Sequence, residues 1–350
     1  MAYIEIDPDP ILYNIRKFRD LAGQSGLSLT AVTKFCTSDP EILQILEKEG
    51  ITSVADSNMP NFLALPPELA GKFSKSLIKT RLSDIRALPD IPEYLWPDRL
   101  FVSDEKLLAA AALLPSGRKP GIMLIVEVGD LKEGFYPDQL PDIIARFKTL
   151  PIEGVSANFA CLSGKMPDAK SLEILKQCAA LIPGNPDISV GGTVVYQLLA
   201  EGRLSAPVSE IRIGEGIFFG HDSSSGGYLP GFRTGAFTLY GEIIEIREKE
   251  ITGPDGGGHT ALGGLRQPRK TGKRLCAVLD FGVLAASSGD IVPVDPAVEI
   301  AGQTFDFTVA DITDSQRKYA AGEYVGFTAD YAAASQALLN TYITRIILKE

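Results

Sequence analysis

The feature that most constrains the fold is the alternation of short apolar runs with segments of helical periodicity between residues 10 and 220. In segments such as 39–49 and 168–182, apolar residues recur at three- and four-residue spacing, which predicts amphipathic helices. Apolar runs that alternate with helices are typical of parallel strands buried on both faces. The candidate strands are 28–34, 53–56, 76–80, 99–103, 121–128, 154–158, 187–192 and 210–214.

Eight strand–helix units predict an α/β fold of the (β/α)8 TIM barrel type over residues 10–225. Such a barrel takes roughly 250 residues, so a chain of 350 residues has room for one further small domain. The rival fold is an open doubly wound sheet. No G-x-G-x-x-G motif follows the first strand, so the dinucleotide-binding form of that sheet is not indicated.

Beyond residue 222 the pattern changes. Serine, glycine and proline punctuate residues 222–231, and residues 236–246 then alternate apolar and polar side chains as a half-buried strand does. We therefore predict a C-terminal all-β domain over residues 236–350, which the alternating N-terminal strand 2–6 joins. Its further strands are expected near 275–281, 304–311, 323–328 and 342–348, and the Gly-rich segment 253–273 is expected to be an excursion between two strands.

Charge and cysteine content narrow the class of protein. The net charge is −10, from 34 basic and 44 acidic side chains, and no basic block occurs, so neither nucleic acid nor an anionic membrane is an expected partner. The four cysteines show no C-x-x-C spacing, so we expect no disulfide framework and no metal site. The N-terminus carries acidic residues where a signal peptide carries basic ones, and we expect a cytoplasmic protein.

Lys34 ends the first predicted strand of the barrel. A primary amine at the end of a buried strand is costly to desolvate unless it is paired, neutralised or used covalently. Desolvation lowers the pKa of a lysine, and a neutral amine can form a Schiff base with an aldehyde. The alternative is a structural lysine whose side chain reaches water from the strand end.

Two glycine-bearing turns follow the seventh and eighth predicted strands, where TIM barrels commonly bind phosphate. Gly191 and Gly192 form the first turn and Gly214 lies in the second, and glycine lets backbone N–H groups approach an anion. Thr193 adds a hydroxyl donor beside the first turn. The alternative is that these glycines only reverse the chain.

Arg212 ends the last predicted strand, so the barrel mouth collects a lysine, a phosphate cradle and an arginine. This set predicts pyridoxal 5′-phosphate (PLP) as the cofactor, with Arg212 at the pyridine nitrogen. Arginine keeps its proton, so the ring nitrogen stays unprotonated and the ring is a weaker electron sink, which suits removal and return of a Cα proton. The alternative for Arg212 is an ion pair with Glu210 or Glu215.

Several of these stretches resemble the alanine racemase N-terminal superfamily, and most closely its ornithine racemase branch. The resemblance spans nearly the whole chain and rests on residues 31–34 (AVTK) with 39–42 (DPEI), 55–57 (ADS), 129–134 (GDLKEG), 156–161 (SANFAC), 191–192 (GG) and 212–215 (RIGE). In the C-terminal domain it includes 236–239, 309–315 and Tyr331. It implies a fold-type III PLP enzyme in which Lys34 forms the Schiff base. The residues expected to bind the cofactor are Lys34, Asn158, Gly191, Gly192, Thr193, Arg212 and Gly214.

Such proteins are commonly homodimers in which the β domain of one subunit covers the barrel mouth of the other.

The chain departs from the pattern of this family in two places. The chain reads Thr193-Val194-Val195 where the branch usually carries Asn-Ser-Ser, and residues 277–284 lack the tyrosine that serves alanine racemases as the acid opposite the lysine. Cys161, Asp280 and His221 are candidates for that second acid. The alternatives are a core cysteine, a turn aspartate and a surface histidine.

Three functions fit these residues. The first is a PLP-dependent racemase that interconverts L- and D-amino acids. The second is a non-catalytic PLP-binding carrier or regulator, and the third is a PLP-free Schiff-base enzyme such as an aldolase. For a racemase, the acidic residues Asp56, Glu127, Asp130 and Glu133 can accept the distal ammonium of ornithine or lysine, or else form a solvated rim that pairs with Lys132.

Overall fold

The computed structural model describes residues 1–115, 119–252, 259, 262 and 270–349. They form two compact units, one of Ile11–Thr234 and one that joins Met1–Pro10 to Gly235–Glu350. Most of the Gly-rich segment predicted at 253–273 lies outside the described residues.

The larger unit is a closed barrel of eight parallel strands, which confirms the predicted (β/α)8 fold. Each strand pairs with the next along the chain, and the last strand returns to pair with the first. The strands are β2 (Ser28–Val32), β3 (Ser53–Asp56), β4 (Ser74–Leu77), β5 (Arg99–Val102), β6 (Gly121–Ile125), β7 (Ile152–Asn158), β8 (Asp187–Gly191) and β9 (Glu210–Ile213).

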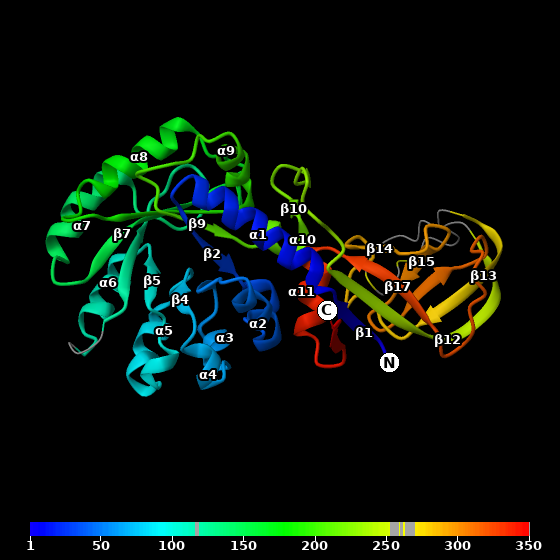
Figure 1. Cartoon of the computed structure of the whole chain (residues 1–350). Coiled ribbons are helices and arrows are strands. Elements are labelled where there is room, and N and C mark those ends of the chain that lie inside the picture. The colour runs from blue at the N-terminus through cyan, green and yellow to red at the C-terminus, as the bar shows by residue number, and fades with distance from the viewer. Residues whose placement is uncertain (116–118, 253–258, 260–261, 263–269, 350) are drawn as a thin grey trace. The chain divides into compact units, whose positions relative to one another are not determined.

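Helices surround these strands (Figure 1). They are α1 (Pro8–Gln24), α2 (Pro40–Lys48), α3 (Met59–Leu63), α4 (Pro67–Ala70), α5 (Leu82–Ala87), α6 (Glu105–Ala112), α7 (Leu140–Arg146), α8 (Ala169–Ala179), α9 (Tyr196–Ala200) and α10 (Glu215–Phe219). The start of α2 follows from its sequence, because the Asp39 side chain accepts hydrogen bonds from the Glu41 and Ile42 amides at 3.0 and 3.3 Å and Pro40 fits the first helical turn.

The strands are buried on both faces, as their apolar composition predicts. All five residues of β6 are buried, for example. The predicted run 121–128 ended too late, because Val126 leaves the barrel ladder to form an isolated bridge with Phe135. The run 76–80 was placed too late, since β4 begins at Ser74 and ends at Leu77.

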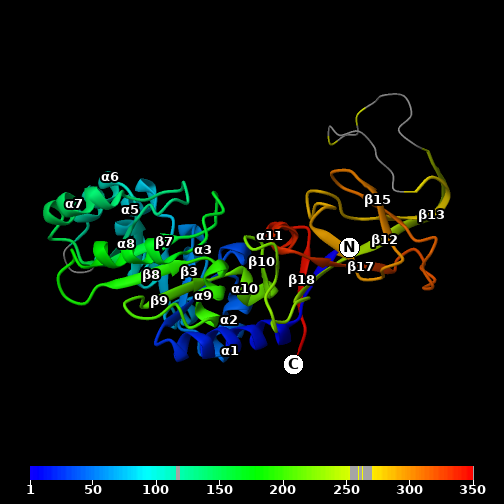
Figure 2. The same ribbon diagram turned by 90° about the horizontal axis from the view of Figure 1, so that it is seen from above.

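The smaller unit is built on the long strand β12 (Phe237–Ile251), which pairs antiparallel with three other strands (Figure 2). The N-terminal strand β1 (Tyr3–Ile6) is one of them, and it also pairs in parallel with β18 (Thr344–Ile347). The remaining elements are β13 (Gly272–Leu279), β14 (Ile291–Pro293), β15 (Glu299–Gln303), β16 (Thr308–Asp311), β17 (Tyr324–Ala329) and the helix α11 (Tyr331–Leu339). The sequence pattern missed β14, β15 and α11.

Among the described residues, every helix is too short or too polar to cross a lipid bilayer.

Gly154 tests the packing of the barrel. A Cβ at this position in β7 would lie 2.1 Å from the carbonyl oxygen of Asp187, its partner in β8. We expect Gly154→Ala to lower the free energy of unfolding by about 1–3 kcal/mol, because the two strands must move apart. Denaturant titration with circular dichroism measures the change.

The control is Gly23→Ala in α1, where a Cβ meets no atom within 4 Å. Alanine there should leave stability unchanged or raise it by about 0.5–1 kcal/mol. Equal stability of the two variants would contradict the packing described for β7 and β8.

Candidate active site

Lys34 lies at the mouth of the barrel, two residues beyond the end of β2. It opens the short 3-10 helix η1 (Lys34–Cys36) and is exposed. The prediction of a desolvated amine at the end of a buried strand was therefore wrong, because β2 already ends at Val32 and the chain turns before Lys34. An exposed amine at a barrel mouth is open to a ligand that arrives from solvent.

A buried polar cluster holds the turn that carries Lys34. Thr37 and Ser38 adopt the left-handed conformation with φ of 54° and 52°, which costs free energy for residues other than glycine. The Ser38 hydroxyl donates to Asp56 Oδ2 at 2.9 Å and lies 2.9 Å from Thr33 Oγ1. These contacts fix the backbone on both sides of Lys34.

Asp56 is fully buried, and this burial raises the pKa of its carboxyl group. Besides Ser38, it accepts hydrogen bonds from the Asn58 amide and the Asn61 side chain, both at 2.9 Å. The suggestion that Asp56 receives a substrate ammonium was wrong, because its oxygens are occupied by the turn and by α3.

Arg212 enters the same mouth from β9. Strands β2 and β9 are paired neighbours, with Thr30 opposite Arg212, so Lys34 and Arg212 lie at the ends of adjacent strands. The Arg212 side chain is almost fully buried. Burial lowers its pKa to about 10, so the guanidinium is still charged at neutral pH.

The guanidinium is held in one orientation by neutral groups. Its Nη2 donates to Asn158 Oδ1 at 3.1 Å and to the Ala157 carbonyl at 3.3 Å, and its Nη1 donates to Ser189 Oγ. The guanidinium carbon lies 4.7 Å from the centroid of the Phe101 ring. Asn158, predicted to bind the cofactor, contacts Arg212.

Among the described residues, neither alternative partner predicted for Arg212 forms a direct ion pair with it. Glu210 is buried and accepts hydrogen bonds from the hydroxyls of Thr30 and Ser189. Glu215 binds Nδ1 of His221 at 2.8 Å and the Ser223 amide at 3.1 Å. Glu210 therefore reaches Arg212 only through Ser189.

The predicted glycine turns lie beside Arg212 and β2. A Cβ at Gly191 would meet Arg212 Nη2 at 2.5 Å, and one at Gly214 would meet the Val32 carbonyl oxygen at 3.2 Å. Gly192 has a φ of 118°, which side-chain-bearing residues rarely adopt. Thr193 ties the two turns together, because its Oγ1 accepts a hydrogen bond from the Gly216 amide at 3.0 Å.

Cys161 lies in the loop after β7, close enough to Lys34 for their charges to interact. The residue is exposed, but partial desolvation of its thiol raises the pKa of that group, and the nearby Lys132 and Lys34 only partly oppose this. The thiol is therefore protonated at neutral pH, as a proton donor must be.

The other two candidates for the second acid make structural contacts. Asp280 belongs to the smaller unit, where its carboxylate accepts from the Ala2 amide at 2.7 Å and the Glu242 amide at 2.8 Å. His221 lies in β10 (His221–Asp222), paired with β11 (Gly227–Tyr228), and binds Glu215. These bonds hold Asp280 between β1 and β12, and His221 against α10.

Among the described residues, one carboxylate of the acidic loop after β6 has a buried oxygen without a hydrogen-bond partner. Asp130 Oδ1 accepts from the amides of Leu162 and Ser163 at 3.2 and 3.4 Å, which joins this loop to the one after β7. Within the described residues Asp130 Oδ2 is buried and has no hydrogen-bond partner. Glu133 lies 3.8 Å from Lys132, and Glu127 accepts from the Gly129 amide.

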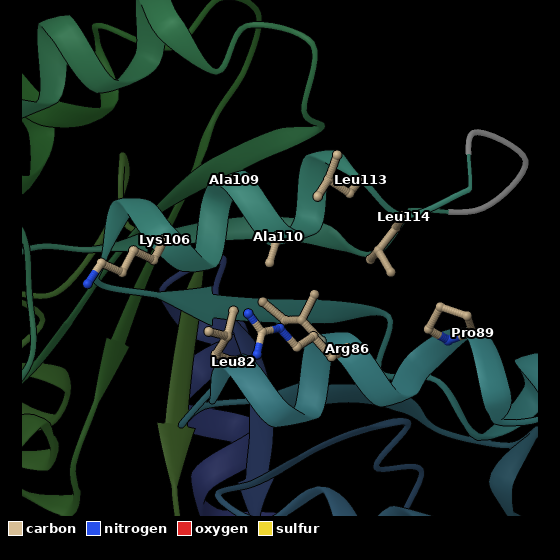
Figure 3. A pocket seen from close by; sticks show the side chains of 9 residues that line it. Leu82, Arg86, Pro89, Lys106, Ala109, Ala110, Leu113 and Leu114 are labelled. Atoms are coloured by element: carbon tan, nitrogen blue, oxygen red, sulfur yellow. The ribbon is translucent and has the colours of Figure 1, made fainter.

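A separate groove of about 400 Å³ lies on the outside of the barrel, between α5 and α6 (Figure 3). Its walls are largely apolar, with Leu82 and Ile85 from α5 facing Ala109 and Ala110 from α6. It contains no residue from the carboxyl end of a barrel strand, so it is not the candidate active site.

Residues 6–222, more than half of the chain, match the family described as "Alanine racemase, N-terminal domain". The chain belongs to this family. The resemblance seen in the sequence is thereby confirmed.

Relatives of known activity cover nearly the whole chain. The lysine racemase of Thermotoga maritima is 25% identical over 341 residues, covering 95% of this chain and 94% of the relative. The ornithine racemase of Acetoanaerobium sticklandii is 24% identical and covers 99% of each chain.

Solved alanine racemases share the fold. The enzyme from Bartonella henselae, with covalently bound pyridoxal phosphate, superposes with a TM-score of 0.72 at 15% identity over 99% of both chains. That from Corynebacterium glutamicum gives a TM-score of 0.74 at 14% identity, again over 99% of both chains.

The polar residues inside this racemase-family barrel were not predicted from the sequence. Ser156, Ser189 and Thr30 are fully buried, although each lies in a strand that was interpreted as an apolar run. The signal that could have indicated these buried polar residues was a hydroxyl-bearing residue at the centre of an apolar run. The buried polar cluster of Thr33, Ser38 and Asp56, called the clamp from here on, was also not predicted. It joins residues that lie at or beyond the ends of two different strands.

The clamp can be tested with Ser38→Ala. The substitution removes the donor to the buried Asp56 Oδ2, so we expect a loss of about 1–3 kcal/mol in the free energy of unfolding. Thr37→Gly is the matched control, because glycine adopts the left-handed conformation of the same turn freely and stability should change by less than about 1 kcal/mol. If Ser38→Ala were as stable as Thr37→Gly, the clamp would not hold this turn.

Proposed function

We propose that this protein is a PLP-dependent amino-acid racemase. One observation carries the proposal: an exposed amine, Lys34, and a buried, charged guanidinium, Arg212, lie at the ends of two paired strands in a barrel of this family. The names of its lysine and ornithine racemase relatives support the same activity.

The residues of the mouth fit this cofactor. The Lys34 amine is accessible to an aldehyde, and Arg212 can donate an N–H to the pyridine nitrogen. At Gly192 and Gly214 a Cβ would lie 3.0 and 3.2 Å from the carbonyl oxygens of Phe159 and Val32, so these turns pack at a closeness that only glycine allows comfortably. We assign the phosphate to them, with Gly191 and Thr193 completing the cradle.

Bound PLP would withdraw electrons from the Cα of an amino acid and so make its proton acidic. We assign removal and return of that proton on one face to the Lys34 amine. Arg212 keeps its own proton at neutral pH, so a ring nitrogen bound to it would stay unprotonated. This limits electron withdrawal to what proton exchange requires.

Racemisation needs a second acid on the opposite face. We propose Cys161 as the first candidate, because its thiol is near Lys34 and is protonated at neutral pH. Asp280 is the second candidate. In a homodimer whose β domain covers the partner's mouth, it would come from the partner subunit, but two backbone amides already bind its carboxylate.

We further propose that this homodimer works in the cytoplasm. The four cysteines show no C-x-x-C spacing, so the sequence does not indicate a disulfide framework. A chain without a disulfide framework is typical of a reducing compartment.

The substrate class that we propose is basic amino acids. Both relatives named above act on amino acids with a distal amine. Asp130 supports the same class in this chain, since its Oδ2 is a buried carboxylate oxygen that lacks a partner among the described residues. A distal ammonium would supply the missing donor.

Substitution of Lys34 separates the three functions considered above. Wild-type protein with PLP should be yellow and should exchange the Cα proton of lysine or ornithine for deuterium, and Lys34→Ala should lose both properties. Lys132→Ala is the matched control from the same mouth and should keep the absorbance. A wild-type protein that absorbs but never exchanges deuterium would be a PLP-binding carrier, and one that never absorbs would be a PLP-free protein.

Asp130→Asn tests the substrate class. Asparagine keeps an acceptor for the Leu162 and Ser163 amides and loses the negative charge. We expect kcat/KM for lysine and ornithine to fall about 10- to 100-fold, as the loss of a charged hydrogen bond predicts, while alanine is little affected. The control is Glu127→Gln. An equal loss for all three amino acids would contradict a role in selecting basic substrates.

A further inference from the structure

Arg212 carries its charge at a place that water does not reach. The residue is 2% exposed, and its hydrogen bonds go to a hydroxyl, a carbonyl and an amide. A buried charge without a counter-ion is strongly destabilised. The barrel must therefore contain a negative charge that acts on this guanidinium.

Glu210 is that charge. It precedes Arg212 by two residues on β9, so both side chains point to the same side of the strand, and its side chain is buried. Among the groups that raise the pKa of Arg212, Glu210 contributes most, ahead of Cys161 and Glu133. On its other side Glu210 faces Arg99, whose Nη1 lies 3.9 Å from its Oε2.

Ser189 links the two charges in a fixed order. Arg212 can only donate and an ionised glutamate can only accept, whereas a hydroxyl has one proton and two lone pairs. The Ser189 hydroxyl must therefore accept from Arg212 Nη1 and donate to Glu210 Oε2. The residue types therefore set the donor and the acceptor of each hydrogen bond between Arg212, Ser189 and Glu210. Hydrogen bonds linked in this way polarise one another.

We propose that Ser189 and Glu210 are positioning residues for the cofactor: Glu210 is the counter-ion of Arg212, and the Ser189 hydroxyl orients the guanidinium that contacts the cofactor's ring nitrogen. This inference rests on the proposed function of Arg212. It predicts that the loss of either residue weakens only the contact with the ring nitrogen and leaves the phosphate and Lys34 contacts unchanged.

The barrel supplies a matched control. Ser156, Ser189 and Glu210 form one row across β7, β8 and β9, because Ser156 pairs with Ser189 and Ser189 pairs with Glu210. Ser156 is as buried as Ser189, yet within the described residues its hydroxyl has no hydrogen-bond partner. The two serines thus share residue type, depth and sheet position and differ in the contacts to Arg212 and Glu210.

The test is a titration of the apo-protein with PLP and with its 1-deaza analogue, in which C–H replaces the ring nitrogen. Ser189→Ala and Glu210→Gln should bind PLP about 10-fold more weakly than wild type, and Ser156→Ala should bind it within about twofold. All variants should bind the deaza analogue as wild type does, because it has no nitrogen for Arg212 to contact.

Each remaining outcome has a distinct meaning. Ser189→Ala that binds PLP as tightly as Ser156→Ala would overturn the inference. Equal weakening toward PLP and the analogue would also overturn it, by showing general damage to the site. If Glu210→Gln does not fold, Ser189→Ala decides the question alone. Wild-type protein that binds neither compound would refute the proposed function itself.

Discussion

The burial of one guanidinium inside the barrel is the constraint on which the rest of this site depends. An apolar barrel interior is a poor place for a positive charge, and Arg212 is almost fully buried there. Its position is possible because three strands supply polar partners: Asn158 from β7, Ser189 from β8 and Glu210 from β9 itself. The interior of this barrel is therefore polar around Arg212.

The two halves of the site are built in different ways. Arg212 is rigid, since its guanidinium is fixed by hydrogen bonds and by the Phe101 ring. Lys34 is exposed on a turn, and what is fixed there is the backbone, through Ser38 and Asp56. This division suits a site in which one group holds a cofactor ring still while a flexible amine moves a proton.

Much of the fold could be predicted from the sequence, because strand and helix periodicities are local. The eight barrel strands were recognised in order, and the helix predicted at 39–49 is α2. The exposure of Lys34 could not be predicted, since it depends on a turn held by Asp56 from the next strand. The same holds for the link between Arg212 and Glu210, because the bridging Ser189 comes from another strand.

The predicted residues of the site differ in how strongly the structure supports them. Arg212, Gly191 and Asn158 lie in direct proximity, whereas Asp280 is held by amides of its own sheet. A second acid taken from a different element, or from a different subunit, leaves no pattern in the local sequence. Contacts between residues of different elements can be identified only from the three-dimensional structure.

The central claim is that Lys34 is the residue that binds the aldehyde of PLP. The most direct measurement is to incubate the protein with PLP, reduce it with borohydride and map the modified peptide by mass spectrometry. The account predicts one phosphopyridoxyl group, on Lys34. Modification of another lysine in its place, or of none, would contradict it.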